Sequence, residues 1–264
     1  MHFSPFDHYL PRESVLHALE ARPKVVATLL FALSVVLLPD GAWMGFLLAW
    51  GLLVAASAAG GVGMGYLLKR SLVALPFLLP ALSILFTLPG RPLFRLALGP
   101  WLLTATESGA VRFLSVLLRS WLSVQAAVLL TAVTPFPEVI HALHHLRFPR
   151  LIVAVIAFMY RYLFVLGDEA LRLLRARQSR SARVDARRGG GTLRWRAQVA
   201  GGMAGQLFLR SYERSERVYA AMASRGYRGE LLVMHPHALQ RRDWLFLLLA
   251  AVGLALVQCL GRCL

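Results

Sequence analysis

The chain has 264 residues, of which 58% are hydrophobic and only 16% are charged, and its mean hydropathy is +0.60. This composition excludes an ordinary soluble domain of the same length and indicates an all-α, polytopic membrane protein. The net charge of +16 calls for an acidic partner or a membrane surface.

Apolar runs along the chain predict a bundle of five or six membrane-spanning helices. Two runs are short or interrupted: residues 25–39 follow Lys24, and residues 151–167 contain Arg161 near their polar end. The other four are about as long as a bilayer is thick, or longer; they are residues 43–68, 71–90, 120–137 and 244–261.

Proline and glycine are concentrated in and before the run of residues 71–90. Pro76, Pro80 and Pro89 lie within it, and a cluster of glycines lies at residues 60–65. These residues permit kinks and close helix packing, which any packed membrane bundle can use.

The segment of residues 167–242 is strongly basic and holds 16 arginines against 6 acidic residues. Because positively charged loops stay on the cytoplasmic side of a membrane, this segment should face the cytoplasm. We therefore expect a transmembrane bundle over residues 1–166, a cytoplasmic module over 167–242 and a final transmembrane helix over 243–264. Whether five or six runs cross the membrane decides the side of the N-terminus, and the sequence leaves that open.

Two amphipathic helices are predicted in and next to the basic segment. The first continues the run of residues 151–167 to about Arg180. The second covers residues 206–225, where apolar side chains recur at spacings of three and four. It should end near Gly226, because glycine is the usual residue just past a helix end. Glycines 189–191 predict a flexible joint between the two helices.

Each of these helices ends in an arginine between small or polar residues. The first triplet is Ala176, Arg177 and Gln178, and the second is Ser224, Arg225 and Gly226. Small neighbours let a partner's surface close around the arginine side chain, and the planar guanidinium suits a carboxylate in a protein groove. We therefore predict a docking contact at each triplet.

Three histidines, His141, His144 and His145, have the i, i+3, i+4 spacing that could hold a metal ion. Only Glu138 offers a further ligand nearby. We therefore interpret the histidines as the polar face of an interfacial helix.

Other functions can be weighed on the same residues. Arg112 and Arg119 could line a polar path through the membrane, and Arg119 is the better candidate because Arg112 can reach the surface. The arginines and Trp195 could bind nucleic acid, but the chain has no nucleic-acid-binding motif. Binding of acidic lipid is compatible with docking. A membrane-embedded enzyme would have to use Asp168, Glu169 and the histidines, which form a poor catalytic set.

The order and spacing of several motifs make the chain resemble a known family. It is similar to the transmembrane coupling subunit, or T component, of energy-coupling factor (ECF) transporters, in the cobalt and nickel branch called CbiQ/NikQ. The resemblance covers nearly the whole chain, and the motifs that carry it are Arg22-Pro23-Lys24, Met159-Tyr160-Arg161-Tyr162-Leu163-Phe164, Asp168-Glu169-Ala170, Arg175-Ala176-Arg177-Gln178-Ser179-Arg180, Arg210-Ser211-Tyr212-Glu213-Arg214-Ser215-Glu216-Arg217 and Met222-Ala223-Ser224-Arg225-Gly226-Tyr227.

The resemblance implies a role in energy transmission. In that family, two cytoplasmic coupling helices each present an arginine-centred triplet to a groove on one of two ATPase subunits. By position, Arg177 and Arg225 are the coupling arginines, and Gln178 stands where many relatives have Ser or Gly.

The same resemblance implies a non-catalytic, multi-pass subunit of the inner membrane, with no cofactor or metal site of its own. ATP would be bound by the ATPase subunits, and the cobalt or nickel ion by a separate substrate-binding membrane subunit. A T component of a vitamin importer and a membrane-embedded enzyme are the alternatives.

Overall fold

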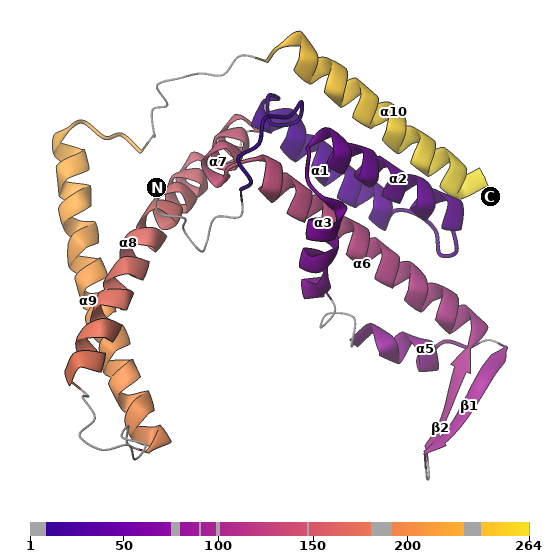
Figure 1. Cartoon of the computed structure of the whole chain (residues 1–264), viewed down its shortest axis with the longest axis horizontal. Coiled ribbons are helices and arrows are strands. Elements are labelled where there is room, and N and C mark those ends of the chain that lie inside the picture. The colour runs from indigo at the N-terminus through magenta and orange to yellow at the C-terminus, as the bar shows by residue number, and fades with distance from the viewer. Residues whose placement is uncertain are drawn as a thin grey trace. The chain divides into compact units, whose positions relative to one another are not determined.

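The computed structural model describes residues 9–74, 80–89, 91–98, 101–146, 148–180, 192–229 and 239–263, and Figure 1 shows their secondary structure. The chain forms two compact units, Met1–Leu146 together with His235–Leu264, and Arg147–Met234. Helices dominate both units, which confirms the predicted class of helical membrane protein.

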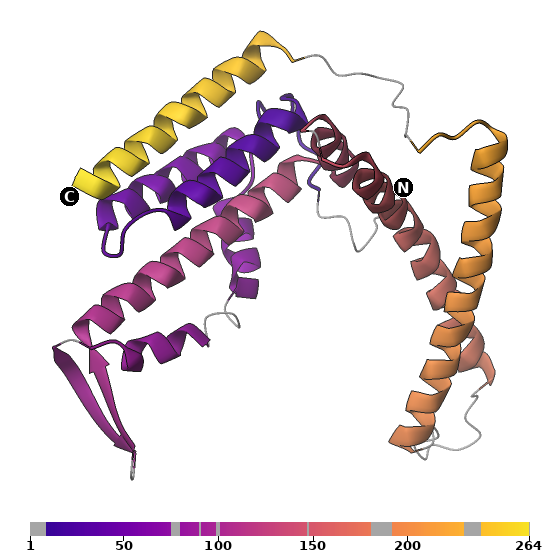
Figure 2. The same cartoon turned by 180° about the vertical axis from the view of Figure 1, so that it is seen from behind.

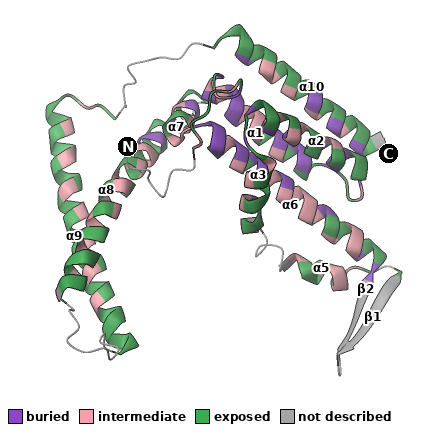
Figure 3. Ribbon diagram, viewed as in Figure 1, coloured by how far each residue is buried: buried purple, intermediate pink, exposed green. Residues whose placement is uncertain are grey.

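Four helices build the core of the first unit: α1 (Ala21–Val36), α2 (Trp43–Ala59), α6 (Glu107–Val133) and α10 (Arg241–Cys263). Helix α1 packs against α6 and α10, and α2 packs against the same two helices, as Figure 1 shows from one side and Figure 2 from behind. Their buried faces, purple in Figure 3, share one cluster of side chains that includes Val35, Phe46, Leu122 and Val257.

The outer faces of this unit are apolar. Leu29, Leu47 and Leu248 are 59%, 60% and 64% exposed. Among the described residues, three helices are long and apolar enough to cross a membrane, namely Glu107–Val133, Arg150–Ser179 and Arg241–Arg262, and α2 is a shorter apolar helix. Exposed leucines on such helices suit contact with lipid chains.

The apolar run of residues 43–68 is broken into two helices instead of forming one long span. Helix α2 ends at Ala59, and α3 (Met64–Ser71) begins five residues later. Gly61 between them has a φ of 63°, a conformation that side chains other than glycine rarely adopt. The Ser57 hydroxyl donates to the Val62 carbonyl at 2.6 Å, and the Arg12 guanidinium donates to the Gly61 carbonyl, so the break is fixed by hydrogen bonds.

The run of residues 71–90 is also not a single helix. After α3 come a 3-10 turn (Leu72–Ala74), a second one (Pro80–Ser83) and the short α5 (Ile84–Thr87). Proline lacks the N–H that helix hydrogen bonding needs, and Pro80 opens one of these turns, whereas Pro76 lies outside the described residues. Helices α3 and α5 both pack along α6, so this segment runs beside α6 in pieces.

A two-stranded antiparallel hairpin connects α5 to α6, and the sequence did not predict it. Strand β1 (Pro92–Leu98) pairs with β2 (Trp101–Thr106), with Pro92 opposite Thr106. Thr106 then caps α6, because its hydroxyl accepts a hydrogen bond from the Gly109 N–H at 3.2 Å. Helix α6 therefore starts thirteen residues before the predicted run of 120–137.

One end of the first unit gathers the beginnings of α1 and α10 and the end of α6. The Glu20 N–H donates to the Asp243 carboxylate at 3.1 Å, and the Leu10 N–H donates to the Ala132 carbonyl at 3.0 Å. Helix α7 (Phe136–His145) follows α6 and packs against α1. The chain therefore leaves this unit after α7 and re-enters it through α10 at the same end.

The second unit is a pair of long helices, α8 (Arg150–Arg180) and α9 (Leu193–Ser224). Glu169 pairs with Arg210, while Arg177, farther along α8, meets Trp195, nearer the start of α9. This order shows that the helices run antiparallel. Helix α8 ends where the sequence predicts, but α9 begins thirteen residues before the predicted helix of 206–225, and glycines 189–191 lie outside the described residues.

Candidate docking surface on the helix pair

The two predicted triplets lie at the ends of α8 and α9. Ala176 and Gln178 are exposed in the last turns of α8, with Arg177 half-buried between them. Ser224 is the last residue of α9, and it is exposed together with Arg225 and Gly226. Figure 3 shows that the helix pair is largely exposed, and α9 has no buried residue among those described.

Arg225 is presented by a well-formed helix end. The Tyr227 N–H donates to the Met222 carbonyl and the Gly226 N–H to the Ala223 carbonyl, both at 3.0 Å. Gly226 has a φ of 79°, so these bonds form a Schellman motif with glycine in the left-handed conformation. The sequence placed this helix end correctly, and the motif directs the chain away so that the Arg225 side chain stays open to solvent.

Arg177 is held differently, because it lies over an aromatic ring of the other helix. Its guanidinium carbon is 5.8 Å from the centroid of the Trp195 ring, within the range of a cation–π contact. Trp195 stands in the first turn of α9, where its backbone N–H donates to the Thr192 hydroxyl at 3.3 Å. The sequence pattern indicates Trp195 only as a base-stacking residue and does not predict this contact.

An ion pair joins the middle of the two helices. The Arg210 guanidinium donates a hydrogen bond to the Glu169 carboxylate, whose side chain is only 15% exposed. Arg172 lies 3.9 Å from the same carboxylate. Glu169, which a membrane enzyme would have needed as a catalytic group, is therefore engaged in holding α8 to α9.

The helix pair sets the distance between the two triplets. Arg177 meets α9 at Trp195, and Arg225 follows thirty residues later at the other end of that helix. At 1.5 Å per residue this is a separation of about 45 Å along one straight helix. The two arginines are thus separated by nearly the whole length of α9.

The histidines form a ring cluster on α7. The His141 and His145 ring centroids are 4.6 Å apart, and those of His144 and His145 are 5.6 Å apart. Within the described part of the chain, no group of three or more His, Cys, Asp or Glu residues could hold a metal ion. Burial, followed by the positive charge of Arg22 and the neighbouring His144, lowers the pKa of His145.

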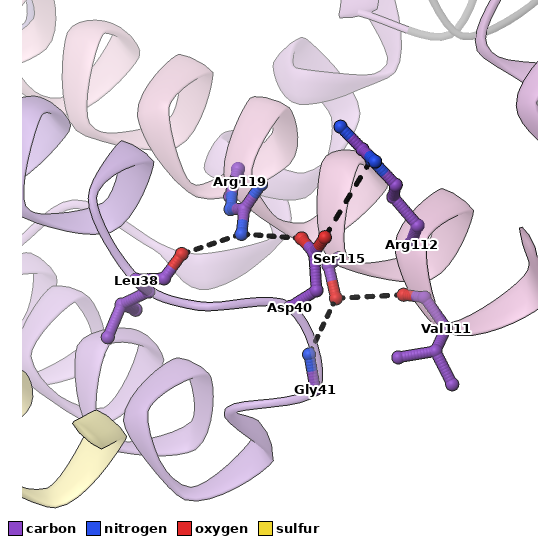
Figure 4. Close-up of polar contacts among 7 residues, drawn as sticks. All are labelled: Leu38, Asp40, Gly41, Val111, Arg112, Ser115 and Arg119. Atoms are coloured by element: carbon purple, nitrogen blue, oxygen red, sulfur yellow. Dashed lines mark hydrogen bonds and ion pairs between the residues drawn. The ribbon is translucent and has the colours of Figure 1, made fainter. Parts of the chain in front are cut away.

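Arg119 and Arg112, considered above as residues of a polar path, both bind Asp40 in the loop between α1 and α2 (Figure 4). The Arg119 guanidinium donates to the Leu38 carbonyl at 2.6 Å and to the Asp40 carboxylate at 2.7 Å. Arg112 lies 3.7 Å from the second carboxylate oxygen. These contacts anchor the loop to α6, which gives Arg119 a structural role.

Comparisons with known proteins bear on the whole chain. The family model described as CbiQ, cobalt transport protein, matches residues 12–235. An uncharacterised protein of Methanocaldococcus jannaschii is 27% identical over 261 residues, covering 97% of this chain and 86% of that protein. The cobalt transport protein CbiQ of Salmonella typhimurium is 29% identical, and the match covers 60% of this chain and 70% of that protein. The energy-coupling factor transporter transmembrane protein EcfT of Exiguobacterium sibiricum is 29% identical, and the match covers 96% of this chain and 97% of that protein.

Proposed function

The chain belongs to the CbiQ family of cobalt transport proteins, and from this premise we propose that it is the coupling subunit of an ATP-driven ECF importer of cobalt or nickel. The family match confirms the resemblance drawn from the motifs. It makes the chain a transmembrane component of a transporter, in agreement with its long apolar helices. Catalysis of ATP hydrolysis would then belong to other subunits.

The observation that carries the proposal is the placement of the two triplets on the helix pair. Arg177 and Arg225 lie at opposite ends of an antiparallel pair of helices that the Glu169–Arg210 ion pair joins. Two ATPase subunits side by side would offer two separate grooves, and one arginine would enter each. Closure of the ATPase pair would then move both helices together, because packed helices shift as units instead of bending smoothly.

The path of the chain supports a five-span topology with the N-terminus in the cytoplasm. The chain leaves and re-enters the first unit at one end, so the segment between must begin and end on one side of the membrane. If α8 crossed, the arginine-rich α9 would have to cross back, at a high cost in free energy. The five crossings would be α1, α2, the broken segment from α3 to α5, α6 and α10.

The apolar half of α8 would then be available for contact with another protein. Leu151, Val155, Met159 and Leu163 follow one another at intervals of four and are 74%, 57%, 60% and 42% exposed. Residues at this spacing lie on one face of a helix. We assign this stripe to contact with the substrate-binding membrane subunit, whose surface would also be apolar.

The second candidate is the same role in an importer of another substrate, such as a vitamin. The relatives include the EcfT protein of E. sibiricum, whose name gives no substrate and which aligns over 96% of this chain, whereas the CbiQ protein of S. typhimurium aligns over 60%. Both candidates predict the same docking chemistry, because ATPase docking does not depend on the transported molecule.

An uptake measurement distinguishes the candidates. Cells that express this chain with its own ATPase and substrate-binding subunits should accumulate radioactive cobalt or nickel in an ATP-dependent way, and Arg225→Glu should abolish the uptake. Arg217→Glu is the matched control, because Arg217 is an exposed arginine of the same helix with only a 3.9 Å pairing to Glu213. Accumulation of a vitamin without metal uptake would favour the second candidate.

A further inference from the structure

An apolar cleft of about 970 Å³ lies between α1, α2, α6 and α10, entirely within the first unit. Its walls are mostly leucine, phenylalanine and alanine, and they include Phe31, Leu52, Ala56, Leu129 and Leu249. Its charged lining residues are Glu13, Lys24 and Arg242. Lys24 and Arg242 lie at the end of the unit where α1 and α10 begin. The cleft is therefore amphiphilic along its length.

Lys24 is the unusual residue of this cleft. It is only 5% exposed, and its ammonium nitrogen has no hydrogen-bond partner among the described residues. A buried, unpaired ammonium group is costly. Lys24 also stands in the first turn of α1, near the positive end of the helix dipole, where a cation is unfavourable and an anion is stabilised.

Two of the acidic groups nearby, Asp243 and Glu20, are used for other contacts. Glu138 and Asp243 attract the Lys24 ammonium group from a distance. Both carboxylate oxygens of Asp243 accept backbone N–H groups, from Glu20 at 3.1 Å and from Gln240 at 2.8 Å. Glu20 itself lies 2.8 Å from the guanidinium of Arg22. A polar position beside Lys24 therefore remains for an anion from outside the chain.

We propose that this cleft binds one membrane phospholipid, with its phosphate at Lys24 and Arg242 and an acyl chain along the apolar walls. Phosphate is the anionic group that lysine and arginine bind at a membrane surface. The phosphate would lie at the level where α1 and α10 begin, and the acyl chain would extend from it into the hydrocarbon layer of the membrane.

The volume of the cleft agrees with this occupant. It falls in the range of about 300–1,000 Å³ that is common for sites binding small ligands. A helix from a partner fits less well, because a cylinder about 10–12 Å across would fill this volume with only about two turns. The binding does not depend on the transported substrate and goes beyond the coupling role proposed above.

The test is to purify the full chain from membranes in a mild detergent, to wash away the surrounding bilayer lipid, and to measure the phospholipid that stays bound. Wild type should keep one phospholipid per chain. Lys24→Gln, which removes the charge, and Ala250→Phe, which fills the apolar wall, should each lower retention about tenfold or more. Lys69→Gln is the matched control, because Lys69 is an exposed lysine outside the cleft and should retain lipid like wild type.

Two results would overturn the proposal. One is equal lipid retention by wild type and the Ala250→Phe variant. This variant keeps every charge, so the comparison holds even if the Lys24→Gln variant does not fold. The other is capture of a polypeptide instead of a lipid by a photoreactive residue in place of Leu249, in membranes that contain the partner subunits. Loss of metal uptake alone would bear on the coupling role and not on this site.

Discussion

Gly226 decides how Arg225 is presented. Its φ of 79° closes the Schellman motif at the end of α9, and residues with a side chain pay about 1–2 kcal/mol in that conformation. The sequence alone predicts this helix end, because glycine is the residue that most often follows the last turn of a helix. It cannot predict the Arg177–Trp195 contact, since that depends on how two helices cross.

Gly226→Ala should therefore destabilise the end of α9 by about 1 kcal/mol and weaken ATPase docking. Gly205→Ala should have the opposite effect on stability, a gain of about 0.5–1 kcal/mol, because Gly205 lies inside α9 with open space around it. Thermal unfolding of the two variants measures both changes in stability. Destabilisation by both, or by neither, would disagree with this description of the helix end.

Asp40 is the second residue with a clear structural role, because it binds both Arg119 and Arg112. Asp40→Asn should cost about 1–3 kcal/mol, since Arg119 is only 19% exposed and would lose its charged partner. The α1–α2 loop should become more accessible to proteases. Unchanged stability together with lost transport would instead assign Asp40 and Arg119 to a functional path.

At the scale of elements, the helix pair of the second unit is held by few contacts. The main polar one is the Glu169–Arg210 ion pair, with Arg172 beside it. Sequence periodicity predicted both helices, because apolar residues at spacings of three and four are enough for that. Apolar length wrongly predicted one continuous membrane span in each of the runs of residues 43–68 and 71–90. The apolar composition continues through Gly61 and Pro80, where the backbone does not continue the helix.

The ion pair can be tested with a double-mutant cycle of Glu169→Gln and Arg210→Met. We expect a coupling energy of about 1 kcal/mol, as for partly exposed pairs. The distance between spin labels on α8 and α9 should become more broadly distributed in each single variant. A coupling energy of zero with unchanged distances would mean that other contacts hold the pair together.

At the scale of the whole molecule, the order of the crossings determines how docking reaches the membrane. The sequence left five and six spans open because α8 is apolar enough to cross by composition. We propose five, because the chain leaves and re-enters the first unit at one end. The hairpin between α5 and α6 has no counterpart in the predicted pattern, since the expected bundle had helices only.

Single cysteines test this topology in a background where Cys259 and Cys263 are replaced by serine. Glu13→Cys and Arg228→Cys should both react with a membrane-impermeant thiol reagent from the cytoplasmic side. Arg262→Cys, at the other end of α10, should react from the outside. Labelling of positions 13 and 228 from opposite sides would restore the six-span arrangement.

Docking of the ATPase subunits through both arginines is the central claim, and co-purification from membranes tests it most directly. Wild type should retain the ATPase subunits, whereas Arg177→Glu and Arg225→Glu should each weaken retention about tenfold or more and the double variant should lose it. Arg217→Glu should retain them like wild type. If the double variant inserts normally and still holds the ATPase as wild type does, or if wild type holds none, the coupling assignment is wrong.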